Sequence, residues 1–340
     1  MDTLIRAGAL QGYEALMNEL GLDPLPLLIR HGINHGATTN TDMLISLAAT
    51  IELLEESAAV AGCPDLGLRL AAHQDYEMMG VLAVVIQNAP TILQAAEDAS
   101  RYIFLHTPAM VIAVERFSPL YRDCVTLRLA IQQPWYAPQR QAIDSAIGYM
   151  WRLVKLLTEG SQRLYGVSLP HSPLAHEAIY QRFFGAPVNF AQPYAGLHMH
   201  QDALTADLAH INPMLRQLAL DYISRREMPR EKTLTDQVRQ AITGTLGVNK
   251  GTKLEIAEIL GVHPRTLQRR LGGEGNTFEA IREEIHKDAT LRFLHETNIP
   301  LNQLADVMGF SGQSSFTRRC KHWFGESPSK IRKESANDKG

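Results

Sequence analysis

An internal repeat in the last third of the chain constrains the fold more than any other feature of the sequence. LEIAEILGVHPRTLQRRL (254–271) and LNQLADVMGFSGQSSFTRRC (301–320) align with Ala257 over Ala305, Gly261 over Gly309 and Val262 over Phe310. After one extra residue in the second copy, Leu267 falls over Phe316, Arg269 over Arg318 and Arg270 over Arg319. The repeat therefore predicts two copies of one small structural unit.

Each copy has the pattern of a helix-turn-helix: a short helix with a small residue, then a glycine and an apolar residue, then a polar helix. The alanine lets the two helices approach closely, the glycine permits the tight turn, and the apolar residue fills the angle between the helices. In the first copy Pro264 suits the first position of the second helix, where its missing N–H costs nothing. We expect helix-turn-helix units at about 254–272 and 301–324.

The segment between the two copies predicts one long connecting helix. FEAIREEIHKDATLRFLHET (278–297) carries apolar residues at helical spacing, namely Phe278, Ile281, Ile285, Ala289 and Phe293. Such a helix would fix the separation of the two units.

The second helix of each unit presents a polar face with side chains suited to DNA. Apolar residues four positions apart on a helix share one face, and this face must point inward. The pairs are Leu267 with Leu271 in the first unit and Phe316 with Cys320 in the second. An α-helix fits the major groove, where arginine pairs with guanine and glutamine with adenine by two hydrogen bonds each. The candidate base-contacting residues are those left on the outward faces: Arg265, Gln268 and Arg269, and Gln313, Ser314 and Arg318.

A second set of polar residues flanks these faces. Side chains beside a recognition face are placed for phosphate oxygens, which position a protein on DNA without specifying sequence. The candidate phosphate-contacting residues are Thr266, Arg270, Ser315, Arg319 and Lys321.

The charge distribution supports DNA over a merely solvated surface. Residues 230–340 hold 18 Lys and Arg against 14 Asp and Glu, whereas residues 1–229 hold 15 against 22. An acidic larger part joined to a basic smaller part suggests that the smaller part meets a polyanion. The stretches 262–273 and 310–325 contain no acidic residue. A solvated helix face with surface ion pairs would normally mix both signs.

The front of the chain predicts an α+β domain followed by the all-α part. Helical patterns cover 41–62, 89–107, 138–158 and 203–226, and strand-like runs cover 110–117, 124–131, 163–169 and 188–200. REMPREKTLTD (226–236) is charged, contains proline and has few apolar residues, which is typical of a linker. We expect an N-terminal domain at 1–225, a linker at 226–234, a DNA-binding domain at 235–334 and a tail at 335–340.

The sequence contains no complete motif for catalysis, cofactor binding or metal binding. The pairs His176-Glu177 and His295-Glu296 lack the second histidine of a zinc protease helix, and GVNKGTK (247–253) has the wrong order for a phosphate loop. His198 and His200 could share one side of a strand and hold a metal, but no third ligand is evident nearby. We therefore expect no catalytic residue, cofactor or metal.

Targeting signals are also missing from the sequence. No apolar run approaches the roughly 18 residues of a membrane span, and the N-terminus lacks the pattern of a secretory signal. Three widely spaced cysteines suit a reducing cytoplasm. We expect a cytoplasmic protein without membrane contact.

The motifs of both parts resemble one known family. HPRTLQRRLGGEG and GFSGQSSFTRRCKHWFGESPSKIRK are similar to the two recognition helices and the ending of the AraC/XylS family of bacterial transcription regulators. His263 departs from the serine-like helix cap that is common there. Four stretches of the front part resemble the family's arabinose-binding-type regulatory domain: LGLDPLPLLIRHGI, CPDLGLRLA, NAPTILQAAEDASRYIFLHTPA and YQRFFGAPVNFAQPYAGLHM. Within the family, the whole chain is most similar to the VirS-type mycobacterial group.

The resemblance implies a sequence-specific DNA-binding transcription regulator whose monomer inserts two helices into successive major-groove segments. It implies double-stranded promoter DNA as partner, location at the bacterial nucleoid, and effector sensing or dimerisation by the first domain. We expect a homodimer controlled by a small effector, and for an activator also RNA polymerase as partner. The apolar runs 80–86 and 110–117, with Tyr76, Tyr102 and Phe104 nearby, are either plain core or the lining of a pocket for a hydrophobic effector. Two alternatives remain: a dimeric regulator without a ligand, and an enzyme domain fused to a DNA-binding module.

Overall fold

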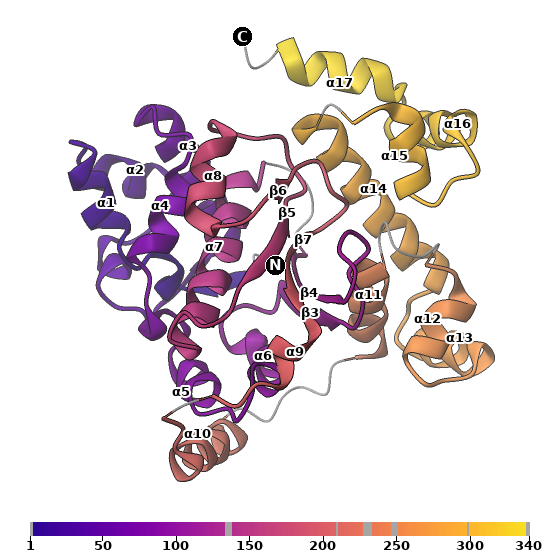
Figure 1. The fold of residues 1–340 in the computed structure, drawn as a ribbon. Helices are drawn as coiled ribbons and strands as arrows, with labels where there is room; N and C mark the ends of the chain where they lie inside the picture. The colour runs from indigo at the N-terminus through magenta and orange to yellow at the C-terminus, as the bar shows by residue number, and fades with distance from the viewer. Residues whose placement is uncertain are drawn as a thin grey trace.

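A computed structural model describes residues 3–132, 138–208, 210–226, 233–245, 251–297 and 299–337. A front part, residues 3–226, contains all the described strands, and a purely helical part follows it (Figure 1). The expected fold class, α+β followed by all-α, is confirmed. No helix among these residues is both long enough and apolar enough to cross a membrane.

A five-stranded sheet organises the front part. Its strands lie in the order β3 (Met110–Glu115), β4 (Cys124–Ile131), β7 (Ala195–His200), β5 (Leu164–Ser168) and β6 (Val188–Asn189). All neighbours are antiparallel except β5 and β6. A separate two-stranded sheet pairs β1 (Leu4–Arg6) with β2 (Leu44–Ser46), which the sequence patterns did not predict.

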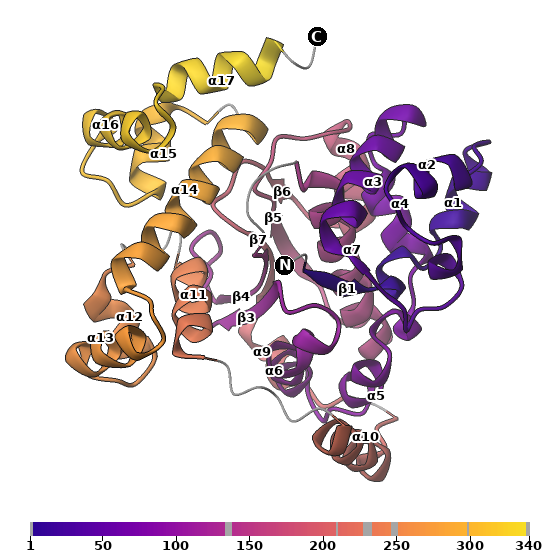
Figure 2. The same ribbon diagram turned by 180° about the vertical axis from the view of Figure 1, so that it is seen from behind.

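Helices surround the sheet unequally. The front part has α1 (Tyr13–Glu19), α2 (Leu25–Arg30), α3 (Leu47–Val60), α4 (Leu66–His73), α5 (Val81–Gln87), α6 (Ile92–Tyr102), α7 (Arg140–Leu157), α8 (Glu177–Phe184), α9 (Gln201–Thr205) and α10 (Pro213–Arg226), with 3-10 turns at Ala7–Leu10, His35–Thr38, Tyr76–Met79 and Ile103–Leu105. The long helix α7 covers one face of the sheet, and α11 (Leu234–Thr245) lies on the other (Figures 1 and 2).

The central strand β4 shows why the sheet has two different faces. Successive side chains of a strand point to opposite faces. Leu127 and Leu129 belong to the large apolar core together with residues of α7. Arg128, between them, points the other way and is only 3% exposed. The strand predicted at 124–131 is confirmed with the same ends.

Two predicted helices differ from the structure at points where the chain makes other hydrogen bonds. The helix predicted at 41–62 begins only at Leu47, because residues 44–46 pair with β1 and the Ser46 hydroxyl accepts the Ala49 N–H. The helix predicted at 203–226 is interrupted between Thr205 and Pro213. In this interruption Asp207 forms an isolated antiparallel β-bridge with Thr91, and the Leu208 N–H donates to the Pro90 carbonyl.

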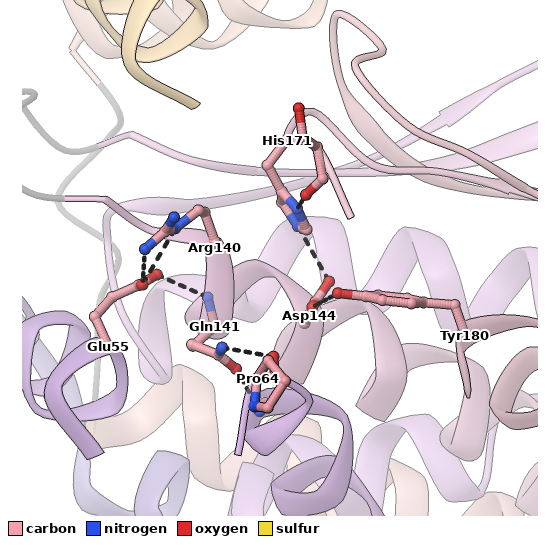
Figure 3. Close-up of polar contacts among 9 residues, drawn as sticks. Glu55, Pro64, Arg140, Gln141, Asp144, His171 and Tyr180 are labelled. Atoms are coloured by element: carbon pink, nitrogen blue, oxygen red, sulfur yellow. Dashed lines mark hydrogen bonds and ion pairs between the residues drawn. The ribbon is translucent and has the colours of Figure 1, made fainter. Parts of the chain in front are cut away.

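A buried polar network ties α7 to α8 and to the segment after β5 (Figure 3). The Asp144 carboxylate accepts a hydrogen bond from the Tyr180 hydroxyl at 2.7 Å and one from His171 Nε2 at 3.1 Å. All three side chains are buried. Burial, together with the neighbouring Asp144 carboxylate, raises the pKa of Tyr180, so that its hydroxyl stays protonated and donates.

The N-terminus of α7 is held by a second set of polar contacts in the same view (Figure 3). The Glu55 carboxylate accepts from Arg140 Nη2 at 2.7 Å and from the Gln141 backbone N–H at 2.9 Å. The Gln141 side chain in turn donates to the Pro64 carbonyl and accepts the Gly67 N–H. These bonds fix α7 against α3 and α4, and so fix the helix on which the sheet packs.

Replacing Asp144 by alanine should destabilise the protein strongly. Two buried polar side chains, His171 and Tyr180, would lose their acceptor, and each buried donor left unsatisfied costs about 1–3 kcal/mol. Urea unfolding followed by circular dichroism measures the loss. Arg30→Ala, which removes an ion pair with Glu56 at an exposed arginine, is the control and should change little. A comparable change in both variants would contradict the role of the network.

Candidate nucleic-acid interface

The two repeat copies fold into matching helix-turn-helix units. The first consists of α12 (Lys253–Ile259) and α13 (Pro264–Gly273), and the second of α15 (Leu301–Val307) and α16 (Gln313–Phe324). The turn glycines Gly261 and Gly309 have φ of +63° and +71°, a conformation that glycine adopts without strain. In both turns the N–H of the following apolar residue donates at 2.9 Å to the carbonyl of the buried alanine, Ala257 or Ala305.

The connecting helix is one continuous α14 (Phe278–Glu296), as predicted. It packs into two separate apolar cores. Phe278 and Ile281 belong to the core of the first unit with α11, and Ala289 and Phe293 belong to that of the second unit. Ile285 contacts both cores. The last helix, α17 (Pro328–Asn337), closes the second core with Ile331 and continues beyond residue 334.

The first recognition helix, α13, has its apolar face fully buried. Leu267 and Leu271 are both 0% exposed. Pro264 occupies the start of the helix, and the imidazole Nδ1 of His263 accepts the Arg265 N–H at 3.2 Å. The histidine therefore supplies the cap that a serine would supply. Arg265, Gln268 and Arg269 are exposed, as expected from the burial of the leucines.

A single surface hollow brings the polar side chains of α13 together. It is lined by His263, Arg265, Thr266, Gln268 and Arg269. Thr266, expected at the flank, is half-buried within this group, and Arg270 is exposed outside it.

The second recognition helix, α16, repeats the arrangement. Phe316 and Cys320 are 0% exposed, and Phe310 of the turn packs on Phe316 with ring centroids 5.5 Å apart. Gln313, Ser314 and Arg318 are exposed on the outward side. Both helices therefore present the residues that the sequence placed outward.

Two of the flanking residues have partners within the protein. The Ser315 hydroxyl donates to the Gly312 carbonyl at 2.7 Å, so it helps to start α16. Arg319 lies 3.7 Å from the Glu283 carboxylate of α14 and over the Trp323 ring. Lys321 is exposed. Glu283 also accepts a hydrogen bond from Trp323 Nε1 at 2.6 Å, which fixes α16 on α14.

The sequence patterns did not predict the carboxylate of Glu274 as a contact that holds the helices of the C-terminal part together. The Glu274 carboxylate accepts hydrogen bonds from the Leu234 and Thr235 N–H groups and from the Thr235 hydroxyl, at 2.7–2.8 Å. The bonds from Thr235 and Leu234 lower the pKa of Glu274. They attach the start of α11 to the end of α13. The partners lie about forty residues apart, and no local pattern marks them.

The helical part docks on the sheet through α11 (Figures 1 and 2). Arg128 of β4 donates from Nη1 to the Glu115 carboxylate at 2.8 Å and from Nη2 to the Thr243 carbonyl at 3.1 Å. Its guanidinium also lies over the Tyr194 ring. The Gln132 side-chain amide donates to the Thr243 hydroxyl at 3.1 Å. One buried arginine therefore joins the α+β domain to α11, the first helix of the helical part.

The histidine pair considered as a metal site is used for hydrogen bonding. His198 is 0% exposed and contacts the hydroxyls of Ser118, Thr126 and Ser168 at 2.8–3.2 Å. Burial lowers the pKa of His198 to about 4. His200 caps α9 by accepting the Asp202 N–H. In the part of the chain that the structure describes, no cluster of three or more His, Cys, Asp or Glu could hold a metal.

Comparisons with known proteins cover both parts. Residues 21–208 match the family model described as the arabinose-binding domain of AraC transcription regulator, N-terminal, and residues 256–334 match a helix-turn-helix domain. The HTH-type transcriptional regulator VirS of Mycobacterium tuberculosis is 33% identical over 332 residues, which are 98% of this chain and 97% of that protein.

Two proteins of Pseudomonas aeruginosa are similar over most of the chain. The ornithine utilization regulator is 24% identical over 298 residues, with 83% of this chain and 82% of that protein covered. The crystal structure of the transcriptional regulator CdpR has a TM-score of 0.44 and 21% identity, over 91% of this chain and 96% of that chain.

The family models account for the front domain and for both helix-turn-helix units, and the relative at 33% identity spans nearly the whole chain. These matches confirm the resemblance seen in the sequence. The chain belongs to the AraC family of transcription regulators, with an arabinose-binding-type N-terminal domain and a helix-turn-helix DNA-binding domain.

Proposed function

We propose that one chain inserts α13 and α16 into successive major-groove segments on one side of double-stranded DNA. The observation that carries the proposal is the match between the two units. Both bury the same apolar positions, turn at the same glycine and expose a polar face without acidic residues, and α14 joins them as one helix. A helix held this way can enter the major groove, where base edges are distinguishable.

Within this proposal the two sets of residues have different tasks. Arg265, Gln268 and Arg269 of α13, and Gln313, Ser314 and Arg318 of α16, contact base edges. Thr266, Arg270, Ser315, Arg319 and Lys321 contact phosphates and set the position of the helices. Arg319 pairs with the Glu283 carboxylate at 3.7 Å in this structure, so it must leave that carboxylate to contact a phosphate. That pair is half-exposed and therefore weak.

Arg269→Ala and Arg318→Ala should each weaken binding to the cognate site by roughly 1–3 kcal/mol and relax base preference at one position. The reason is the loss of a two-bond contact to a guanine. Arg270→Ala should instead weaken binding to all DNA about equally. It should also reduce the slope of log affinity against log salt concentration by about one, because one fewer counterion is released.

Gel-shift titrations test these three variants on a site selected from a random DNA pool and on unrelated DNA. The comparison of Arg269 with Arg270 is internally matched, since both are exposed arginines on α13. Equal loss on both DNAs for Arg269→Ala and Arg318→Ala would refute their assignment to bases.

We also propose that the regulator is a homodimer that associates through α10. This helix packs Ala219 and Ile223 against α5 but leaves Met214 and Leu218 exposed at 75% and 59%. Leu215 is also exposed. These residues follow one another at helical spacing and give an apolar stripe at the end of the front domain. Exposed apolar patches of this kind mark sites of protein association.

Leu218→Glu should weaken dimerisation by about tenfold or more, because it places a charge in an apolar interface. Sedimentation equilibrium at micromolar concentration measures the change. Ile29→Glu on α2, which is 66% exposed, is the matched control and should leave the dimer intact. A chain that is monomeric throughout, or a dimer unaffected by Leu218→Glu, would argue against this interface.

We propose further that a small effector bound by the front domain changes DNA binding, and that the change passes through the contact of β4 with α11. Arg128 supports this route because its guanidinium bonds both to the sheet and to the last turn of α11. An effector acts only if it binds two arrangements of the protein with different affinity. The docked arrangement of α11 on the sheet is one such arrangement.

Arg128→Met should release α11 from the sheet. Amides of α11 should exchange with solvent about threefold faster or more, since local opening becomes easier, and DNA affinity should change by more than about twofold. Hydrogen exchange and gel shifts measure the two effects. Arg116→Met, at an exposed arginine directly after β3, should alter neither quantity. Unchanged exchange in α11 would exclude this route.

A further inference from the structure

A cavity of about 80 Å³ lies inside the front domain, between strands β3 and β4 and helices α5, α6 and α7. Figure 2 shows these elements around the lower half of the sheet. The cavity has room because its walls on α6 and α7 carry small side chains, at Ala95, Ala96, Ala99 and Ala146. Other walls are formed by methionines, at Met78, Met79, Met110 and Met150.

The lining agrees in part with the pocket considered from the sequence. Ile86, Met110 and Ile112 come from the two apolar runs at 80–86 and 110–117. Tyr76, Tyr102 and Phe104 are not among the described residues that line the cavity.

Two polar side chains interrupt this apolar lining. His106 and Tyr149 are 3% and 5% exposed and are the only described lining residues with a side-chain nitrogen or oxygen. The His106 Nδ1 atom and the Tyr149 hydroxyl oxygen are both buried, and neither has a hydrogen-bond partner among the described residues. Buried polar atoms are nearly always paired in folded proteins, so two orphans in one cavity need an explanation.

The cavity wall carries no charge at neutral pH. Burial, assisted by the nearby Arg6 charge, lowers the pKa of His106 to about 4, so its imidazole is neutral at pH 7. Burial likewise raises the pKa of Tyr149, whose hydroxyl stays protonated. A charged ligand would lose its hydration here without gaining a counterion.

We propose that this cavity is the effector site and that it takes an uncharged, mainly apolar molecule with one hydroxyl or carbonyl oxygen. The Tyr149 hydroxyl donates to that oxygen, and a ligand hydroxyl can also bond with His106 Nδ1. The apolar remainder of the ligand packs among the alanines and methionines. This inference rests on the proposed control by a small effector and adds to it the site and the chemical class.

The size of the cavity is compatible with such a ligand. A cavity of about 150 Å³ holds benzene, so the present volume of about 80 Å³ takes only a smaller apolar group without rearrangement, and a six-carbon ligand requires the cavity to widen. Methionine side chains are unbranched and adapt to irregular partners, and the four that line the cavity allow it to widen. Ordered water is the competing occupant, because one water takes up about 30 Å³ in the liquid and water molecules also hydrogen-bond buried polar atoms.

The cavity lies directly behind the contact between the two parts of the protein. Leu127 and Leu129 of β4 line it, and Arg128 between them reaches α11 from the opposite face of the same strand. A ligand that displaces β4 therefore acts directly on Arg128, the residue that bonds to α11.

The experiment uses the full-length protein and three six-carbon probes: 1-hexanol, n-hexane and hexanoate. Calorimetric titration should give the tightest binding for 1-hexanol and the weakest for hexanoate. Tyr149→Phe should weaken 1-hexanol about tenfold, as expected for one buried hydrogen bond, and leave n-hexane nearly unchanged. Tyr76→Phe makes the same chemical change outside the cavity lining and is the matched control.

A second variant fills the space. Ala99→Leu should abolish binding of 1-hexanol and n-hexane and, by filling a void, should not lower the melting temperature by much. If Ala99→Leu does not fold, the Tyr149→Phe comparison still decides. No saturable binding of 1-hexanol would mean that the cavity holds only water, and tighter binding of hexanoate would mean an anion site; either result overturns the proposal. DNA binding, measured on the same samples by gel shift, tests the proposed function separately.

Discussion

The burial of four side chains determines what the DNA-binding helices present. Leu267 and Leu271 in α13, and Phe316 and Cys320 in α16, are wholly inaccessible. Each pair is spaced by four residues, so each pair defines one face of its helix and thereby fixes the rotation of that helix about its axis. The exposed arginines and glutamines have their directions for this reason. Glu274 and Glu283 then fix where each unit sits, by bonding to α11 and to α16.

Strand β4 is the corresponding constraint in the front domain. It is the second strand of the sheet, it separates the apolar cavity from α11, and its side chains alternate between the two. Burying an arginine is costly unless its charge is paired, and Arg128 contacts Glu115, Thr243 and the ring of Tyr194. Two of those partners, Glu115 and Tyr194, belong to the sheet domain, and Thr243 belongs to α11 of the helical part. The burial of Arg128 therefore depends on both parts at once.

The accuracy of the sequence predictions follows from the range of the interactions involved. Periodicity located β4, α7 and α14, because each buries a regular face over many residues. The repeat located both turns, because the glycine and the buried alanine are local requirements. Strands β1 and β2 were missed, since three residues give too short a pattern. Local patterns do not reveal contacts between residues far apart along the chain, such as those of Arg128, Glu274 and Arg319. For the same reason they do not show that buried polar atoms of His106 and Tyr149 lack hydrogen-bond partners among the described residues.

The continuous helix α14 limits how this chain can change in length. Inserting one residue into a helix rotates everything beyond it by about 100° and advances it by about 1.5 Å. The exposed polar face of α16 would then point in a different direction relative to that of α13, although each unit remained intact. Segments between elements tolerate insertions, but a helix that sets the rotational phase of two exposed helix faces does not. Changes in α14 would preserve that phase only near whole turns of the helix, such as about seven residues for two turns.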